Sequence, residues 1–179
     1  MRIISGTHKS RIINMVNVDT TRETTDKVRG AIFNLISDYA FCGNVLDLFS
    51  GSAAMGLEAL SRGCDFAYFN DINRKAYQVG KENAERLGLS KKAHFTNLDY
   101  KAALKRYDVK FKFIFLDPPY KLLCCNEIIE YIHTNNLLLD NGLIICEVDK
   151  EEKINEYKDF VIYKDKEYGI RKIVILKKA

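Results

Sequence analysis

The strongest constraint on the fold is an alternation of short apolar runs and helix-like segments that begins near residue 44. Apolar runs typical of buried strands lie at 45–49, 66–69, 93–96, 113–116 and 143–146. Buried strands that alternate with helices indicate a parallel, doubly wound α/β sheet with helices on both faces. Two further runs, 160–163 and 173–176, have no strong helical pattern between them. They predict a hairpin, and hence an antiparallel edge strand in a seven-stranded, mostly parallel sheet.

The length and composition fit a single α/β unit with an N-terminal appendage. The chain has 179 residues, of which 47% are apolar, so it can bury a substantial core. We expect a basic hairpin or extended arm and a helix over 1–40, and the α/β domain over 41–179. No apolar run approaches the roughly 18 residues of a membrane span, and no signal peptide is visible.

Cysteine usage indicates a reducing compartment. The five cysteines are odd in number and contain no C-x-x-C pair. A disulfide framework or a zinc site is therefore not expected, and the protein is predicted to be cytoplasmic and free of bound metal.

The net charge of +4 is mild, but its distribution is uneven. Residues 1–18 carry +3, residues 91–112 carry +5, and the remainder is acidic. Two basic segments on a near-neutral body are typical of a phosphate-binding footprint, and equally of solvated surface lysine. The charge pattern alone leaves both interpretations open.

A carboxylate follows the predicted strands at the edge where α/β sheets bind ligands. Asp71 lies 20 residues after Gly51, the spacing expected for an acid that binds a ribose. The loop reads Gly51-x-Ala53-x-x-Gly56 and lacks the central glycine of a dinucleotide loop, which disfavours an NAD dehydrogenase. Asp47 lies in an apolar strand, so it must either be bonded, as a cap of the following turn, or face a cationic ligand.

The sharpest string in the chain is Asp117-Pro118-Pro119-Tyr120, which contains both prolines of the protein. Two prolines stiffen a turn and remove two backbone donors, so the turn presents acceptors. Tyr120 adds a flat ring on which a base can stack. The string therefore indicates a site for a planar base with an exocyclic amine; the simpler interpretation is a rigid turn with a core tyrosine.

These strings resemble a known family. The stretches 47–52 and 56–63, together with 117–120, resemble the class I S-adenosylmethionine-dependent methyltransferases, which have a Rossmann-like fold. The opening residues 1–6 and the segment 22–29 narrow the resemblance to the RsmD family. That family methylates N2 of a guanine in 16S ribosomal RNA. The resemblance covers essentially the whole chain.

The resemblance implies roles for individual residues. Asp117, Pro118, Pro119 and Tyr120 would be catalytic, with Asp117 and the Pro118 carbonyl accepting the protons of the amine. S-adenosylmethionine would be held by Asp47, Phe49, Gly51, Ser52, Ala53, Gly56, Asp71, Ile72 and Asp99. The ribosomal RNA would be gripped by Arg2, Lys9, Arg11, Arg22, Thr25, Lys27 and Arg29. Ala53 and the pair Ile170-Arg171 depart from the usual family pattern.

The expected partner is ribosomal RNA or the small ribosomal subunit, and the expected state is a monomer that binds neither membrane nor metal. Two alternatives remain open from the sequence. One is a methyltransferase acting on adenine N6, although the chain has no separate domain for recognising DNA sequence. The other is a non-catalytic RNA-binding protein that holds S-adenosylmethionine, suggested only by Ala53.

Overall fold

The computed structural model describes residues 1–16, 26–119 and 121–179. Seven strands form one sheet in the order β3-β2-β1-β4-β5-β7-β6. Strands β1 to β5 run parallel to one another, and β7 is antiparallel to both β5 and β6. The Rossmann-like class I methyltransferase fold is confirmed, with one difference of detail. The antiparallel strand lies one position in from the edge, and β6 forms the edge.

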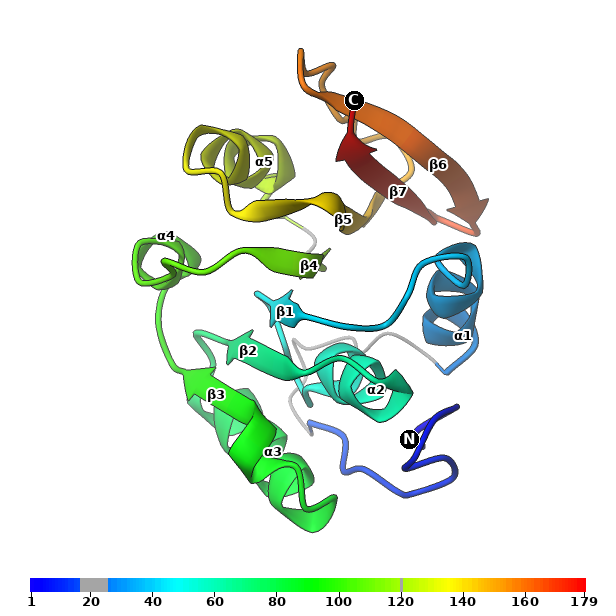
Figure 1. The fold of residues 1–179 in the computed structure, drawn as a ribbon, viewed down its shortest axis with the longest axis vertical. Coiled ribbons are helices and arrows are strands. Elements are labelled where there is room, and N and C mark those ends of the chain that lie inside the picture. Colours follow the sequence, from blue (N-terminus) through cyan, green and yellow to red (C-terminus); the bar gives the residue numbers. More distant parts are fainter. Residues whose placement is uncertain (17–25, 120) are drawn as a thin grey trace.

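The predicted alternation matches the elements of the structure (Figure 1). The strands are β1 (Asn44–Asp47), β2 (Phe66–Asn70), β3 (Ala93–Thr96), β4 (Phe111–Leu116), β5 (Leu138–Asp149), β6 (Phe160–Tyr168) and β7 (Arg171–Lys178). The helices are α1 (Asp26–Leu35), α2 (Ala54–Arg62), α3 (Arg74–Arg86), α4 (Tyr100–Leu104) and α5 (Cys125–Thr134), with a short 3-10 turn at Ser90–Lys92.

The sheet separates two apolar cores. Alternate residues of β4 point to opposite faces, so Phe113 and Phe115 enter one core while Ile114 and Leu116 enter the other. The first core is covered by α1, α2 and α3, and the second by α4 and α5. Because helices cover both faces, the carboxyl ends of the parallel strands remain accessible together at one end of the sheet.

The N-terminal segment pairs with itself and then joins the first core. Arg2 and Ile12 form an antiparallel bridge, as the expected hairpin requires. Ile3 and Ile13 are each 1% exposed and pack in the same cluster as Phe33 of α1 and Val45 of β1. The boundary expected at residue 40 therefore marks no break in the core.

Two local sequence signals differ from the structure. Asn-Gly pairs are typical of turns, but β5 runs through Asn141 and Gly142, with a register shift against β4 that absorbs the irregularity. Residues 100–107 have a helical pattern, but α4 ends at Leu104, and Tyr107 instead packs in the second core. Among the described residues, no helix is both long and apolar enough to cross a membrane.

Candidate active site

A cavity of about 740 Å³ opens at the carboxyl ends of β1, β2 and β4. This is within the range of small-molecule sites, roughly 300–1,000 Å³. It brings together most of the residues predicted for cofactor and catalysis: Asp47, Phe49, Gly51, Ser52, Asp71, Ile72, Asp99, Asp117, Pro118 and Pro119 all line it. Ala53 and Gly56 are buried behind the lining. Tyr120 is outside the described residues.

Asp71 is held at the end of β2 by the loop after β1. One carboxylate oxygen accepts from the Gly51 N–H at 2.8 Å, and the other accepts from the Asn73 N–H at 2.8 Å. Burial raises the pKa of Asp71, and these two bonds oppose the rise. Gly51 has φ 51°, and a side chain there would meet no atom within 4 Å. The glycine therefore leaves the cavity open beside an oriented carboxylate.

Asp47 is the buried acid of the site. It is 4% exposed, and its Oδ2 accepts from the Gly56 N–H of α2 at 3.0 Å. Burial is the largest cause that raises its pKa, to about 7, while the Gly56 bond lowers it and Asp71 adds repulsion. Asp47 is thus the bonded carboxylate that the simpler interpretation required, and it also lines the cavity.

Ala53 occupies a backbone conformation that suits glycine. Its φ of 68° and ψ of 18° are left-handed, and it immediately precedes α2. The conformation costs a non-glycine residue about 1–2 kcal/mol. Its side chain is fully buried, close to the position a Cβ of Gly80 would take. The loop therefore keeps its turn with alanine in place of the usual glycine, and the methyl group points into the protein.

The proline corner follows β4 directly. Pro118 is buried and Pro119 is exposed, and Asp117 is partly exposed at the cavity. The Arg171 guanidinium donates to Asp117 Oδ1 at 3.0 Å and to the Glu147 carbonyl at 2.9 Å. Sequence reasoning gave Arg171 and Glu147 no role, because the pairing of β5 with β7 cannot be read from the local pattern.

Four of the residues predicted to grip RNA are exposed: Arg2, Lys9, Arg11 and Lys27. Arg11 also donates to the Arg86 carbonyl at 3.0 Å. Arg22 and Thr25 are outside the described residues. Lys112 of the second basic segment is 2% exposed and donates to the Asn141 carbonyl at 2.6 Å, so it adds nothing to a surface patch.

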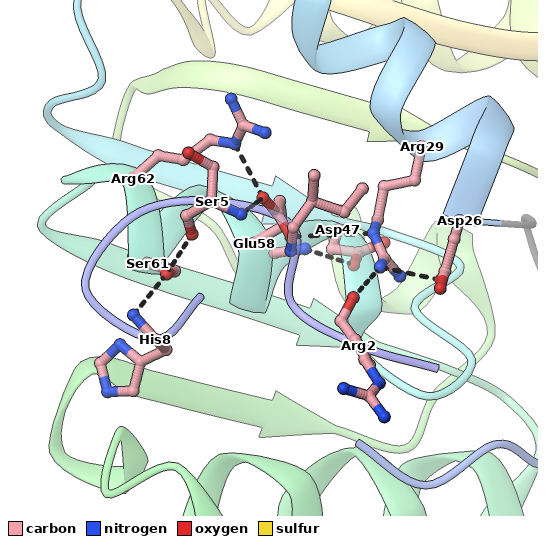
Figure 2. Close-up of polar contacts among 11 residues, drawn as sticks. Arg2, Ser5, His8, Asp26, Arg29, Asp47, Glu58, Ser61 and Arg62 are labelled. Carbon is pink, nitrogen blue, oxygen red and sulfur yellow. Dashed lines mark hydrogen bonds and ion pairs between the residues drawn. The ribbon is translucent and has the colours of Figure 1, made fainter. Parts of the chain in front are cut away.

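The expectation for Arg29 is corrected. Its side chain is fully buried, so a phosphate on the surface cannot reach it. Figure 2 shows the guanidinium directed at Asp26 and at the Arg2 carbonyl, which accepts a hydrogen bond from it. Its Nε also lies 3.8 Å from the buried Glu58. Arg29 therefore serves a structural role: it neutralises a buried acid and ties the N-terminal segment to α1.

Glu58 and Ser61 of α2 hold the N-terminal segment from the other side (Figure 2). Glu58 accepts from the backbone N–H groups of Ile4 at 2.7 Å and Ser5 at 2.9 Å. Ser61 accepts from the His8 N–H at 2.9 Å. The segment is thus fixed on the protein, with the side chains of Arg2 and Lys9 left at the surface.

Within the described ranges, no group of three or more His, Cys, Asp or Glu side chains could hold a metal ion. Two observations fit S-adenosylmethionine. The acids Asp71 and Asp99 line a cavity of suitable size. Gly51 also lines it, and its missing side chain leaves room for a ligand there. The sulfonium and ammonium groups of that cofactor are cations, which suits an acidic wall.

Known proteins are similar to this chain over nearly its whole length. Residues 1–177 match the family described as conserved hypothetical protein 95. The chain is 40% identical to the Bacillus subtilis protein named "Putative rRNA methyltransferase YlbH", over 99% of both chains. It is 30% identical to ribosomal RNA small subunit methyltransferase D of Haemophilus influenzae, covering 95% of this chain and 90% of that protein. The solved structure titled "Putative methyltransferase yhhF from Escherichia coli" superposes with a TM-score of 0.87 at 26% identity, covering 100% of this chain and 98% of that one.

Proposed function

The chain belongs to the conserved hypothetical protein 95 family, that of the RsmD methyltransferases, and on this premise we propose that it methylates small-subunit ribosomal RNA. The methyl donor is S-adenosylmethionine, and the acceptor is the exocyclic N2 amine of a guanine. The observation that carries this proposal is a single cavity with two ends. The Asp71 and Asp99 carboxylates line it together with the Asp117-Pro118-Pro119 corner.

The division of labour follows from the lining residues. At the cofactor end, Asp71 accepts from ribose hydroxyls and Asp99 from the adenine amine. S-adenosylmethionine, when bound, supplies a methyl group on a sulfonium, which is already an activated leaving group. The protein therefore needs chiefly to align donor and acceptor.

At the substrate end, Asp117 and the Pro118 carbonyl each accept a hydrogen bond from one N–H of the amine. These two hydrogen bonds favour a tetrahedral nitrogen. Its lone pair is then no longer delocalised into the ring and can attack the methyl group. The extra proton on the methylated nitrogen passes after attack to the Asp117 carboxylate or to water, so no catalytic histidine is needed. A base within folded RNA must be turned out of its stack to reach this corner. Tyr120 is proposed to stack on it.

The proposal is tested by transfer of a tritiated methyl group to small ribosomal subunits and to naked 16S RNA, followed by nucleoside analysis. We expect label in N2-methylguanosine. Asp117→Ala should reduce the rate at least about 100-fold, because the amine loses a charged acceptor. The matched control is Asp65→Ala, an exposed acid at the amino end of β2. It should retain full activity.

The other outcomes separate the alternatives. Label in N6-methyladenosine would replace guanine with adenine as the target. Cofactor binding without transfer would identify the non-catalytic RNA-binding protein. Comparison of the two substrates shows whether the enzyme acts on free RNA or on the assembled subunit. The proposal also includes a monomeric protein. It places the protein in the cytoplasm, because ribosomal RNA is made there.

A further inference from the structure

Arg171 joins three strands at the substrate end of the cavity. One guanidinium nitrogen donates both to Asp117 Oδ1, at the end of β4, and to the Glu147 carbonyl of β5. The Nε lies 3.6 Å from the Glu147 carboxylate. The side chain is 18% exposed, so these charges interact with limited screening by water.

The strand register explains why a cation is needed here. Leu116 of β4 pairs with Cys146 of β5, so Asp117 and Glu147, the residues that follow, are neighbours. Two carboxylates side by side disfavour the ionised form of each. Strand β7 pairs with β5 on the side away from β4, and there Arg171 lies opposite Asp149. Arg171 is therefore diagonally across from Glu147, and the two side chains share one face of the sheet. It can therefore reach between the two acids.

Further charged and titratable groups lie near this cluster. Glu152 is partly buried, and burial raises its pKa, while Arg171 and Lys172 counteract the rise and Asp149 adds to it. The pKa of the Cys125 thiol of α5 is raised chiefly by its hydrogen bond with Cys146 and by burial, and Asp117 adds a smaller electrostatic contribution. Arg171 thus supplies positive charge to a corner formed by acids and a neutral thiol.

We propose that Arg171 is a positioning residue, which keeps the Asp117 carboxylate ionised and fixed where the substrate amine must bind. This inference rests on the proposed function, because it assigns Asp117 the role of acceptor. Arginine suits the task better than lysine. Its planar group is always charged and can bond to a carboxylate, a carbonyl and a second acid at once.

The first test measures Asp117 directly and needs no activity. Carboxyl carbon NMR follows the titration of Asp117, assigned with Asp117→Asn, in the native chain and in Arg171→Gln. We expect the midpoint in Arg171→Gln to move to higher pH by about one pH unit or more, because the guanidinium no longer offsets the repulsion by Glu147. Arg171→Lys keeps the charge and should move it much less. An unchanged midpoint in Arg171→Gln would overturn the inference even if the enzyme is active.

The second test uses methyl transfer. Arg171→Gln should lower kcat roughly 10- to 100-fold, the value of a charged hydrogen bond, and shift the acid limb of the pH profile upward. The KM for the cofactor should stay constant. The matched control, Lys177→Gln, loses the same charge from the opposite end of β7, where residue 177 pairs with Leu143 of β5, and should leave kcat and the acid limb unchanged. Equal losses in kcat, cofactor binding and thermal stability would instead identify a merely structural ion pair. An inactive native chain would refute the proposed function, while the NMR result would still decide the role of Arg171.

Discussion

At the scale of single residues, the carboxylates that line the cavity could be located from the sequence. The groups that bind those carboxylates were harder to predict. Asp71 could be predicted because the acid that binds a ribose stands at a regular distance after a glycine turn. A bond from Asp47 to the following turn was one of two interpretations of the sequence, and the Gly56 N–H makes that bond. The Arg171 partner of Asp117 could not, because it comes from a strand that follows 54 residues later.

Asp47 should make the stability of the protein depend on pH. Its folded pKa of about 7 lies above its unfolded value, so the folded chain holds the proton more tightly. The resulting stabilisation is complete below the unfolded pKa of about 4 and is lost as pH rises through 7. Between pH 5 and 7, the free energy of unfolding should fall by about 2–3 kcal/mol relative to Asp47→Asn.

Chemical denaturation of both proteins at several pH values measures this difference. The variant keeps an oxygen for the Gly56 N–H but carries no titratable group. Parallel stability curves would show that Asp47 titrates at its ordinary pKa in the folded protein.

At the scale of elements, the helices and strands were predictable because each buries a periodic apolar face. The pairing that Arg29 makes was not, since a basic residue on a predicted helix looks the same whether it faces solvent or a buried acid. Only the packing of α1 beside α2 distinguishes the two. The same limitation applies to Lys112, whose charge was counted in a surface segment although the residue is 2% exposed.

The contact between the N-terminal segment and α2 depends on Gly6. A Cβ at Gly6 would lie 1.8 Å from the Ser61 carbonyl oxygen, and its φ is 84°. Gly6→Ala should therefore lower the free energy of unfolding by about 3 kcal/mol or more, since backbone cannot yield as a side chain does. Thermal and denaturant unfolding measure the loss.

Gly88→Ala is the matched control for that variant. Gly88 has a similar φ of 72° but no atom within 4 Å of the Cβ position, so it isolates backbone strain. It should cost about 1–2 kcal/mol. Equal losses in the two variants would mean that the segment can shift away from α2 without penalty.

At the scale of the whole molecule, charge distribution should govern how the protein meets RNA. Arg2 and Lys9 are exposed on a segment fixed close to the cavity, whose lining includes Met1. The double change Arg2→Glu and Lys9→Glu should weaken binding to 16S RNA. It should also reduce the slope of log affinity against log salt by roughly 1 to 2.

The control reverses two charges elsewhere. Lys105 and Arg106 are exposed and precede β4. They therefore lie near the amino ends of the strands, at the end of the sheet opposite the cavity. Changing both to Glu alters the net charge equally and should leave the salt slope near its native value. Filter binding over a range of salt concentrations measures both, and a larger effect at 105 and 106 would move the RNA surface to that edge.

The position of β7 between β5 and β6 has a consequence for when the protein becomes active during its own synthesis. Strand β6 pairs only with β7 among the described strands, so it has no partner until residues 171–178 have been made. The ion pair between Asp117 and Arg171 likewise forms only after residue 171 has been made. Nascent chains fold as their segments emerge, and pairings distant in sequence form late. The proposed substrate end of the site is therefore completed last, after the residues of the proposed cofactor end have been translated. An unfinished chain on the ribosome lacks the Arg171 contact that we propose holds Asp117 for methyl transfer.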